Sequence, residues 1–328
     1  MRTLKFAASL IAATTLAVPA FAWQPTKAIE FVATAGPGGG TDNFARAVQA
    51  AIVKNKLLDQ PIVVVNKAGG SGAEGYTYVK GMAGDPYHLV FGTSNAWQQP
   101  MVSKVAFKQT DFTPIAAMVQ DEFLLWVKQD GPKDVKEYLA AMKAKGNSAK
   151  MGGAQSKDTD ELLTRMIEKT AGLKFIYVPF KSGAEAAVQL AGGHVDSHVN
   201  NPSESVGQWK GGTQRPLCVF NTKRLAAGPK ITATEGWSDI PTCVEAGLNI
   251  PLFQQPRTIW LPLKVTPEQT AFYVDLMKKV QATPEWKDYI EKSSQTQVFL
   301  SGKEFTDYMN QDAERVHKVA EEQGWLVK

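Results

Sequence analysis

The sequence contains few of the residues that usually carry out chemistry. Its 328 residues include only two cysteines and four histidines. After residue 22, neither the G-x-S-x-G nor the S-x-x-K motif of serine hydrolases occurs. The same part of the chain has no run of about 18 apolar residues, the length that a membrane helix needs. The whole chain has a formal net charge of +4, which is too small to indicate a nucleic-acid partner.

The N-terminus has the pattern of a secretory signal peptide. Arg2 and Lys5 precede a short apolar segment at residues 10–18, and Ala20-Phe21-Ala22 has the A-x-A form of a cleavage site. We therefore expect residues 1–22 to be removed, with cleavage near Ala22. In a bacterium, the remaining chain would be exported to the periplasm. No cysteine lies near the cleavage position, so no lipid anchor is expected.

The two cysteines, Cys218 and Cys243, both lie after the predicted signal peptide. An even number of cysteines in an oxidising compartment favours one disulfide bond. Such a bridge, closing a loop of about 25 residues, would stabilise the fold by roughly 3–4 kcal/mol in the chain-entropy model. The alternative is two buried thiols, because free cysteine packs well as a small apolar side chain.

Strand-like and helix-like segments alternate along the chain. Residues 28–33, 61–65 and 88–92 have the composition of buried strands. Apolar residues at helical spacing follow the first of them, in residues 41–54. This βαβαβ order predicts a mostly parallel sheet with right-handed crossovers.

The length and the order of these segments predict an α/β fold of two lobes. Each lobe would contain a mostly parallel sheet, with a hinge and a ligand cleft between the lobes. Residues 23–123 would form the first part of one lobe and residues 124–220 the other lobe. Residues 221–328 would return mainly to the first lobe and end in helices. Residues 123–127 and 217–220 would be the crossing strands.

Three glycine-rich turns follow strands and precede helices, at residues 36–42, 66–72 and 152–158. Backbone N–H groups in such turns, together with the helix dipole, favour a small anion. The first turn is not a P-loop, because no Lys-Ser/Thr pair follows its glycines. Ligands of open α/β sheets lie at the carboxyl ends of strands. The turns therefore indicate a receptor for an anion.

Several short motifs occur in a characteristic order. They are Gly-Gly-Gly-Thr-Asp at 38–42, Val-Val-Val-Asn-Lys-Ala-Gly-Gly-Ser-Gly at 63–72, Phe-Gly-Thr-Ser at 91–94, Tyr-Val-Pro-Phe-Lys at 177–181, Val-Gln-Leu-Ala-Gly-Gly-His-Val-Asp at 188–196 and Asp-Ile-Pro-Thr at 239–242. In this order and spacing, the chain resembles the receptors of tripartite tricarboxylate transporters, also called the Bug or TctC family. The resemblance covers nearly the whole chain after residue 22.

The resemblance implies a periplasmic binding protein of two lobes, similar to the type II class, and a carboxylate ligand. It also implies delivery of that ligand to a membrane complex with a large and a small integral subunit. The ligand would be a di- or tricarboxylate or an aromatic acid. We expect a monomer that uses no cofactor and no metal ion.

The resemblance further implies which positions contact the ligand. Backbone and hydroxyl donors of the first and third turns would hold the carboxylate, and further positions would face the cleft. These positions are Gly38, Gly39, Thr41, Thr93, Ser94, Ala154, Gln155, Ser156, Asn200 and Asn201.

Two features of this chain depart from many relatives. Gln155, Lys157 and Asp158 stand where many relatives have small or hydroxyl residues. Arg257 stands near a position that is often aromatic, and an arginine in a cleft can clamp a second carboxylate with two hydrogen bonds. The alternative for Arg257 is an exposed side chain at the start of a strand. Lys157 is a further candidate, although single lysines are usually solvated. Acidic residues also open the helix after the third turn, where they complement the helix dipole and conflict with an anion at the same end.

Two other functions remain open at this point. A periplasmic hydrolase acting on an anionic substrate would need a nucleophile and a base, which triads assemble from distant positions. A receptor that serves a membrane sensor would have the same kind of sequence as one that serves a transporter. His194, Asp196 and His198 alternate along an expected strand and are possible metal ligands. We expect no enzyme and no metal site.

Overall fold

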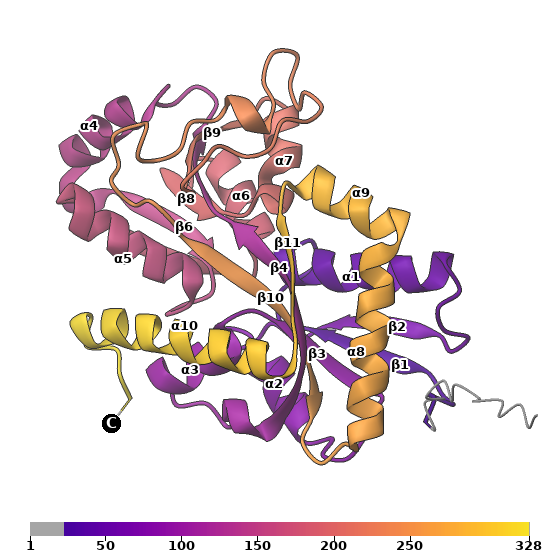
Figure 1. Ribbon diagram of the computed structural model, residues 1–328. Coiled ribbons are helices and arrows are strands. Elements are labelled where there is room, and N and C mark those ends of the chain that lie inside the picture. The colour runs from indigo at the N-terminus through magenta and orange to yellow at the C-terminus, as the bar shows by residue number, and fades with distance from the viewer. Residues whose placement is uncertain (1–22, 328) are drawn as a thin grey trace, which may run out of the picture.

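The computed structural model describes residues 23–327, which form two lobes with one sheet in each (Figure 1). The predicted signal peptide, residues 1–22, lies outside the described residues. The α/β fold of two lobes, expected from the sequence, is confirmed. Among the helices of residues 23–327, none is long and apolar enough to cross a membrane.

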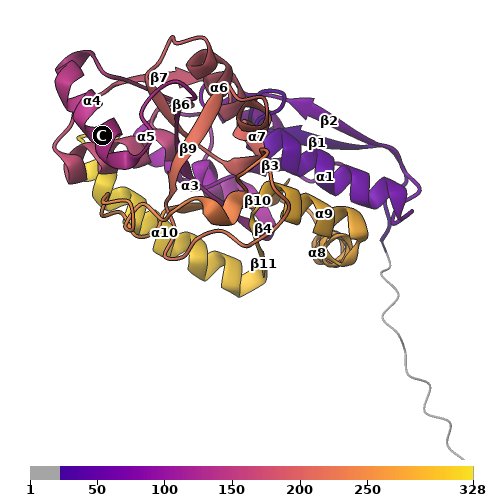
Figure 2. The ribbon, with the colours of Figure 1, turned by 90° about the horizontal axis from the view of Figure 1, so that it is seen from above.

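The first lobe contains a six-stranded sheet in the order β11-β4-β10-β3-β1-β2. Its strands are β1 (Ile29–Ala33), β2 (Ile62–Asn66), β3 (His88–Gly92), β4 (Phe112–Glu122), β10 (Gln254–Pro262) and β11 (Thr296–Leu300). Two groups of helices accompany it: α1 (Gly40–Lys54), α8 (Pro267–Ala282) and α9 (Pro284–Ser293), and then α2 (Ala73–Lys80) and α3 (Asn95–Val102). The first group lies together beside the sheet, with α9 next to α1 (Figure 2).

The second lobe contains a five-stranded sheet in the order β7-β6-β8-β5-β9. Its strands are β5 (Leu124–Lys128), β6 (Lys150–Ala154), β7 (Ile176–Phe180), β8 (Ser197–Asn200) and β9 (Gln214–Val219). Its helices are α4 (Val135–Lys145), α5 (Thr159–Ala171), α6 (Gly183–Ala191) and α7 (Pro202–Lys210). Short 3₁₀ turns lie at Gly146–Ser148 and Trp237–Asp239, and another precedes β4 of the first lobe at Gln109–Asp111.

Both sheets are mixed, whereas the sequence predicted mostly parallel ones. The parallel part is limited to β1, β2 and β3 in the first lobe and to β6, β7 and β8 in the second. In the first lobe, β10 is antiparallel to both β3 and β4. In the second lobe, β5 is antiparallel to β8 and β9. In the first lobe, the difference arises because β4 leads into the second lobe and β10 leads back from it. The strands β4 and β10 are neighbours and therefore run in opposite directions.

Helix α1 shows why the predicted pattern folds as it does. Its apolar side chains recur at helical spacing, and Phe44, Val48 and Ile52 are fully buried against the first sheet. Burying one such side chain contributes roughly 1.5–3 kcal/mol. The helix begins at Gly40, within the first glycine turn, and this order brings its N-terminus to the edge of the sheet where the lobes meet.

The chain crosses between the lobes at two places. The first crossing is at Phe123, between β4 and β5. The second crossing follows residue 253, because residues 221–253 still pack with the second lobe before β10 begins. The second lobe therefore extends beyond residue 220, where the sequence placed its end. The predicted disulfide between Cys218 and Cys243 is confirmed, and it ties this segment to β9.

The C-terminal helix α10 (Gly302–Glu322) contacts both lobes. Phe305 and Met309 belong to an apolar cluster of the first lobe, whereas Val316 belongs to the main cluster of the second. Near its end, Glu322 forms an ion pair of 2.8 Å with Lys169 of α5. In Figure 1, α10 runs beneath α5 and beside α3.

Candidate functional site

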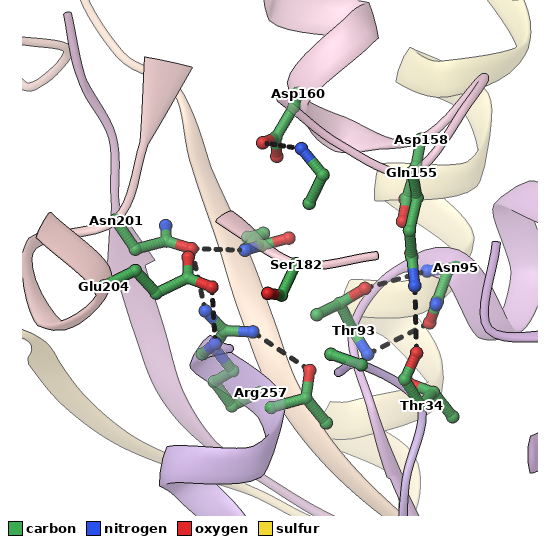
Figure 3. A pocket seen from close by; sticks show the side chains of 15 residues that line it. Thr34, Thr93, Asn95, Gln155, Asp158, Asp160, Ser182, Asn201, Glu204 and Arg257 are labelled. Carbon is green, nitrogen blue, oxygen red and sulfur yellow. Dashed lines mark hydrogen bonds between the residues drawn. The ribbon is translucent and has the colours of Figure 1, made fainter. Parts of the chain in front are cut away.

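A polar cavity of about 30 Å³ lies between the lobes, at the carboxyl ends of strands from both sheets. The first lobe contributes Thr34, Ala35, Gly40, Thr41, Thr93, Asn95, Gln255 and Arg257, and the second contributes Ala154, Gln155, Asp158, Asp160, Ser182, Asn201 and Glu204. Figure 3 shows Glu204 and Asn201 on one side of this cavity and Asn95 and Thr93 on the other. This space is more than one water needs, since a single water requires about 10–15 Å³ measured in the same way.

The structure brings together part of the predicted ligand positions. Six of them line the cavity: Thr41, Thr93, Ala154, Gln155, Asn201 and Arg257. The other five lie nearby without lining it: Gly38, Gly39, Ser94, Ser156 and Asn200. Asn200 lies beneath the surface, where its side-chain amide donates to the carbonyl of Gly183 at 3.0 Å.

The backbone N–H groups of the first turn are already paired. Gly38 donates to Oδ2 of Asp42 at 2.9 Å, and Gly39 donates to the carbonyl of Gly36 at 3.0 Å. Gly40, the first residue of α1, donates to Oε1 of Glu204 at 2.7 Å. Gly38 adopts φ of +74°, a conformation that strongly favours glycine. The geometry of an anion-binding turn is therefore present, with carboxylates of the protein as its anions.

The third turn has the same property. The N–H of Ala154 donates to Oδ2 of Asp160 at 2.7 Å, and the N–H of Lys157 donates to Oε2 of Glu161 at 2.8 Å. The N–H of Gln155 donates to the carbonyl of Phe180 at 2.7 Å. Asp160 and Glu161 are the residues whose presence at the helix start conflicted with an anion there, and the structure shows that they occupy the donors themselves.

Arg257 is buried, so it is not an exposed side chain at the start of a strand. Its Nε donates to Oδ2 of Asp121 at 2.8 Å, and its Nη2 also donates to this oxygen. Nη1 donates to the hydroxyl of Thr41 at 3.1 Å, and Nη2 donates to Oδ1 of Asn201 at 2.8 Å. Although burial opposes its charge, nearby Asp121 and Glu204 keep the pKa of Arg257 raised. The clamping of a ligand carboxylate by Arg257 remains a prediction, because Nε and Nη2, which would form two hydrogen bonds to it, already donate to Asp121.

Three acidic side chains line the cavity and are more than nine-tenths buried. Burial raises the pKa of Asp158 to about 6 and that of Glu204 to about 7, against the lowering effects of hydrogen bonds and of Arg257. Burial also raises the pKa of Asp160 well above its usual value, and the neighbouring Glu204 and Asp158 add to the effect. The cavity is thus lined by three carboxyl groups and one guanidinium group.

Hydrogen bonds connect the lobes around the cavity. The side-chain amide of Gln155 donates to the carbonyl of Thr34 at 2.9 Å. The hydroxyls of Ser94 and Thr159 lie 3.2 Å apart. The second glycine turn lies at the rim of the cavity and does not line it. At this rim, Ser71 exchanges hydrogen bonds with the backbone of Ser156. In the described conformation, hydrogen bonds therefore join the two lobes on several sides of the cavity.

The sequence analysis did not single out Glu204 or Asp121 as site residues. Glu204 lies in the first turn of α7, after Asn200-Asn201, and Pro202 marks the start of that helix. This signal locates the helix, but it does not reveal that Glu204 reaches Gly40, 164 residues away in sequence. Asp121 lies at the end of β4, where no local pattern distinguishes it.

Two other sequence candidates lie outside the cavity. The Nζ of Lys157 donates to the carbonyl of Val102 at 3.1 Å, at the rim. Asp196 pairs with Lys145, whereas His198 is buried against Gln214. Across residues 23–327, no three His, Cys, Asp or Glu side chains form a group suited to a metal ion.

Two lobes that are joined by crossing strands and enclose a polar cavity define a solute-binding protein of the hinged, two-lobe type. The model of the tripartite tricarboxylate transporter family receptor, TctC, matches residues 44–325. The chain belongs to this family.

Individual relatives agree with this assignment. The chain is 25% identical to a Cupriavidus necator protein called "UPF0065 protein in gbd 5'region", over 92% of this chain and 88% of the relative. Its fold is similar to that of the periplasmic binding protein BugD, with a TM-score of 0.83, 19% identity, and coverage of 93% and 100%. It is also similar to an R. palustris protein solved with adipate, with a TM-score of 0.82, 23% identity, and coverage of 92% and 98%. At these identities, the two structural likenesses show the fold alone.

Proposed function

We propose that this chain is a periplasmic receptor that captures a small organic carboxylate between its lobes. It then delivers the ligand to the large and small membrane subunits of a tripartite tricarboxylate transporter. The observation that carries the proposal is the polar cavity closed between the carboxyl ends of the two sheets. Membership of the receptor family supports it, as does the adipate bound to one structural neighbour.

Export to the periplasm rests on two features. The N-terminal residues have the pattern of a secretory signal. The disulfide between Cys218 and Cys243 suits an oxidising compartment.

Ligand capture would proceed by closure of the hinge. The six predicted positions that line the cavity are proposed as ligand contacts, with Thr41, Thr93 and Arg257 on the first lobe and Ala154, Gln155 and Asn201 on the second. A ligand that contacts both sets stabilises the closed form over the open form. The closed form would then present a surface made of both lobes to the membrane subunits.

The composition of the cavity supports a receptor over a hydrolase that uses a Ser-His or Cys-His pair. Among the described residues that line it, there is no histidine, cysteine or lysine. The hydroxyl groups that line the cavity, those of Thr34, Thr41, Thr93 and Ser182, therefore have no lining imidazole to act as a general base. We propose that the protein binds its ligand without chemical change.

A thermal-shift screen of the purified protein against mono-, di- and tricarboxylates and aromatic acids tests this function. A ligand at 100 times its Kd should stabilise the fold by about 2.7 kcal/mol and raise the melting temperature. The same mixtures, followed by NMR, should show unchanged ligand after overnight incubation. Turnover of any of these acids, without a shift by the others, would replace the receptor with an enzyme.

A further inference from the structure

The buried carboxylate of Glu204 joins the N-termini of two helices from different lobes. Its Oε1 accepts hydrogen bonds from the N–H of Gly40, at 2.7 Å, and from the N–H of Gly183, at 3.1 Å. Gly40 opens α1 of the first lobe, and Gly183 opens α6 of the second. Both helix dipoles therefore point their positive ends at this one carboxylate.

Both glycines are positions where a side chain would collide with groups at the cavity. A Cβ at Gly183 would lie 2.6 Å from Oε2 of Glu204. A Cβ at Gly40 would overlap the guanidinium of Arg257. The missing side chains thus leave room for the carboxylate of Glu204 at Gly183 and for the guanidinium of Arg257 at Gly40.

A ligand carboxylate cannot use the same N–H groups while Glu204 is in place. The corresponding donor of the third turn, the N–H of Ala154, is likewise occupied by Asp160. Arg257 is the one cation among the described lining residues, and its two-bond position is held by Asp121. A second carboxylate on the ligand would therefore meet acidic side chains and no free cation.

The cavity does offer unused acceptors. Among the described residues, none donates a hydrogen bond to Oε2 of Glu204, Oδ2 of Asp158 or Oδ1 of Asp160, and all three side chains line the cavity. These acceptors suit a group with several N–H donors and a positive charge. Burial raises the pKa of Asp158 and Glu204, and a cation beside them would offset this effect.

An independent feature indicates an oxygen atom on the same ligand. Asn95 is 1% exposed and lines the cavity, opposite Glu204 in Figure 3. Its Oδ1 accepts hydrogen bonds from the hydroxyl of Tyr76 and from the N–H of Thr93. Its Nδ2 donates to no other residue in the described part of the chain. The amide nitrogen is thus an unpaired donor on a side chain that lines the cavity.

We infer that Glu204 determines specificity, and that the receptor selects a small carboxylate which also carries an ammonium group over a dicarboxylate of the same length. The ammonium group faces Glu204 and Asp160, and the ligand carboxylate accepts from Asn95 on the opposite side of the cavity. This inference rests on the proposed receptor function, because it names the ligand class of the same cavity.

The test compares pairs of ligands that differ only in the terminal group. Isothermal titration calorimetry with purified protein would use β-alanine against succinate, 4-aminobutyrate against glutarate, and 5-aminopentanoate against adipate. In the best-fitting pair, the ω-amino acid should bind about tenfold more tightly or better, the effect of one charge-assisted contact. An equal or tighter dicarboxylate would overturn the inference and leave the receptor function intact. If no member of the panel and no other organic acid binds, the receptor function itself fails.

Glu204→Gln supplies the second measurement, because glutamine keeps an oxygen for the two glycine N–H groups and removes the charge. The preference for the ω-amino acid should fall by about tenfold. Glu314→Gln, at an exposed site of α10, is the matched control and should leave the preference unchanged. An unchanged preference in Glu204→Gln would also overturn the inference. The comparison of ligands on the unaltered protein stands even if the variant does not fold.

Discussion

The two lobes contribute opposite charges to the cavity. The lining residues of the first lobe include one arginine and no acid, whereas those of the second include Asp158, Asp160 and Glu204. Closure places Glu204 of the second lobe on the N-terminus of α1 and beside Arg257 of the first. The lobes therefore attract one another through groups that a ligand would otherwise contact. A ligand has to improve on this existing pairing, and its net charge matters as much as its shape.

The largest effect should follow from removing the positive charge of the first lobe. Arg257→Met leaves Asp121, which is 0% exposed, without its counter-ion. The free energy of unfolding should fall by about 3–5 kcal/mol, as for other broken buried ion pairs. Urea denaturation measures this loss.

The matched control is Arg224→Met in the second lobe, whose arginine pairs with Glu245 at an exposed site. Its loss should be about 0–1 kcal/mol. Equal losses in the two variants would show that burial of the Arg257–Asp121 pair has no special weight.

The second lobe should also depend on its covalent link. Replacing Cys218 and Cys243 together by alanine releases a loop with a sequence separation of 25 residues. The unfolding free energy should fall by about 3–4 kcal/mol. Hydrogen exchange should show faster opening of β9 and of residues 221–253, with the sheet of the first lobe less affected. Equal acceleration across both sheets would contradict the prediction that the disulfide stabilises mainly the second lobe.

A smaller, pH-dependent effect should come from the acids of the second lobe. Burial raises the pKa of Asp158 from its usual 3.8 to about 6, so the folded protein binds a proton more readily than the unfolded chain. Its contribution to stability is complete below about pH 4 and is lost as the pH rises to about 6. In Asp158→Asn, the loss of stability between pH 4 and pH 7 should be smaller by about 1–3 kcal/mol.

Urea denaturation at several pH values measures this difference between Asp158→Asn and the unaltered protein. Asparagine keeps the side-chain oxygen that accepts from the N–H of Thr159 at the start of α5. The helix start is therefore preserved, and an identical pH profile in both proteins would refute the raised pKa of Asp158.

The smallest effect should be on the balance between the closed and open forms. Gln155→Asn shortens the side chain that donates to the carbonyl of Thr34 across the cleft. Asparagine tolerates the positive φ of this position, +62°, so the turn itself should persist. Loss of one such hydrogen bond costs about 1 kcal/mol, which lowers the closed-to-open ratio about fivefold.

Small-angle X-ray scattering of the unliganded protein should report a larger radius of gyration for Gln155→Asn. The exposed Gln24→Asn is the control and should scatter like the unaltered protein. A larger radius in both variants would mean that the cross-lobe hydrogen bond is not the cause.

Local patterns in the sequence predicted much of the fold. The strand, glycine turn and helix around residues 31–54 are neighbours in the chain, so their spacing alone indicates their structure. The disulfide followed from the number of cysteines and the expected compartment. The antiparallel neighbours were missed, because the composition of β10 does not reveal which strands it lies between.

The site was predictable only in part, because local patterns do not show which distant segments come together. Its turns are local features, and residues of the first and third turns do line the cavity. The groups that fill the turns come from distant segments, since Glu204 reaches Gly40 only after both lobes have folded. Sequence patterns identified places where an anion fits, and only tertiary structure shows that side chains of the protein occupy them.

Helix α10 has a mechanical consequence. Its first turns pack on the first lobe and its last turns pack on the second. The helix is therefore a third connection between the lobes, in addition to the two chain crossings. When the lobes separate, either the last turns of α10 must leave α5 or its first turns must shift relative to α3. A fluorophore attached to the exposed face of α10 would therefore report the angle between the lobes.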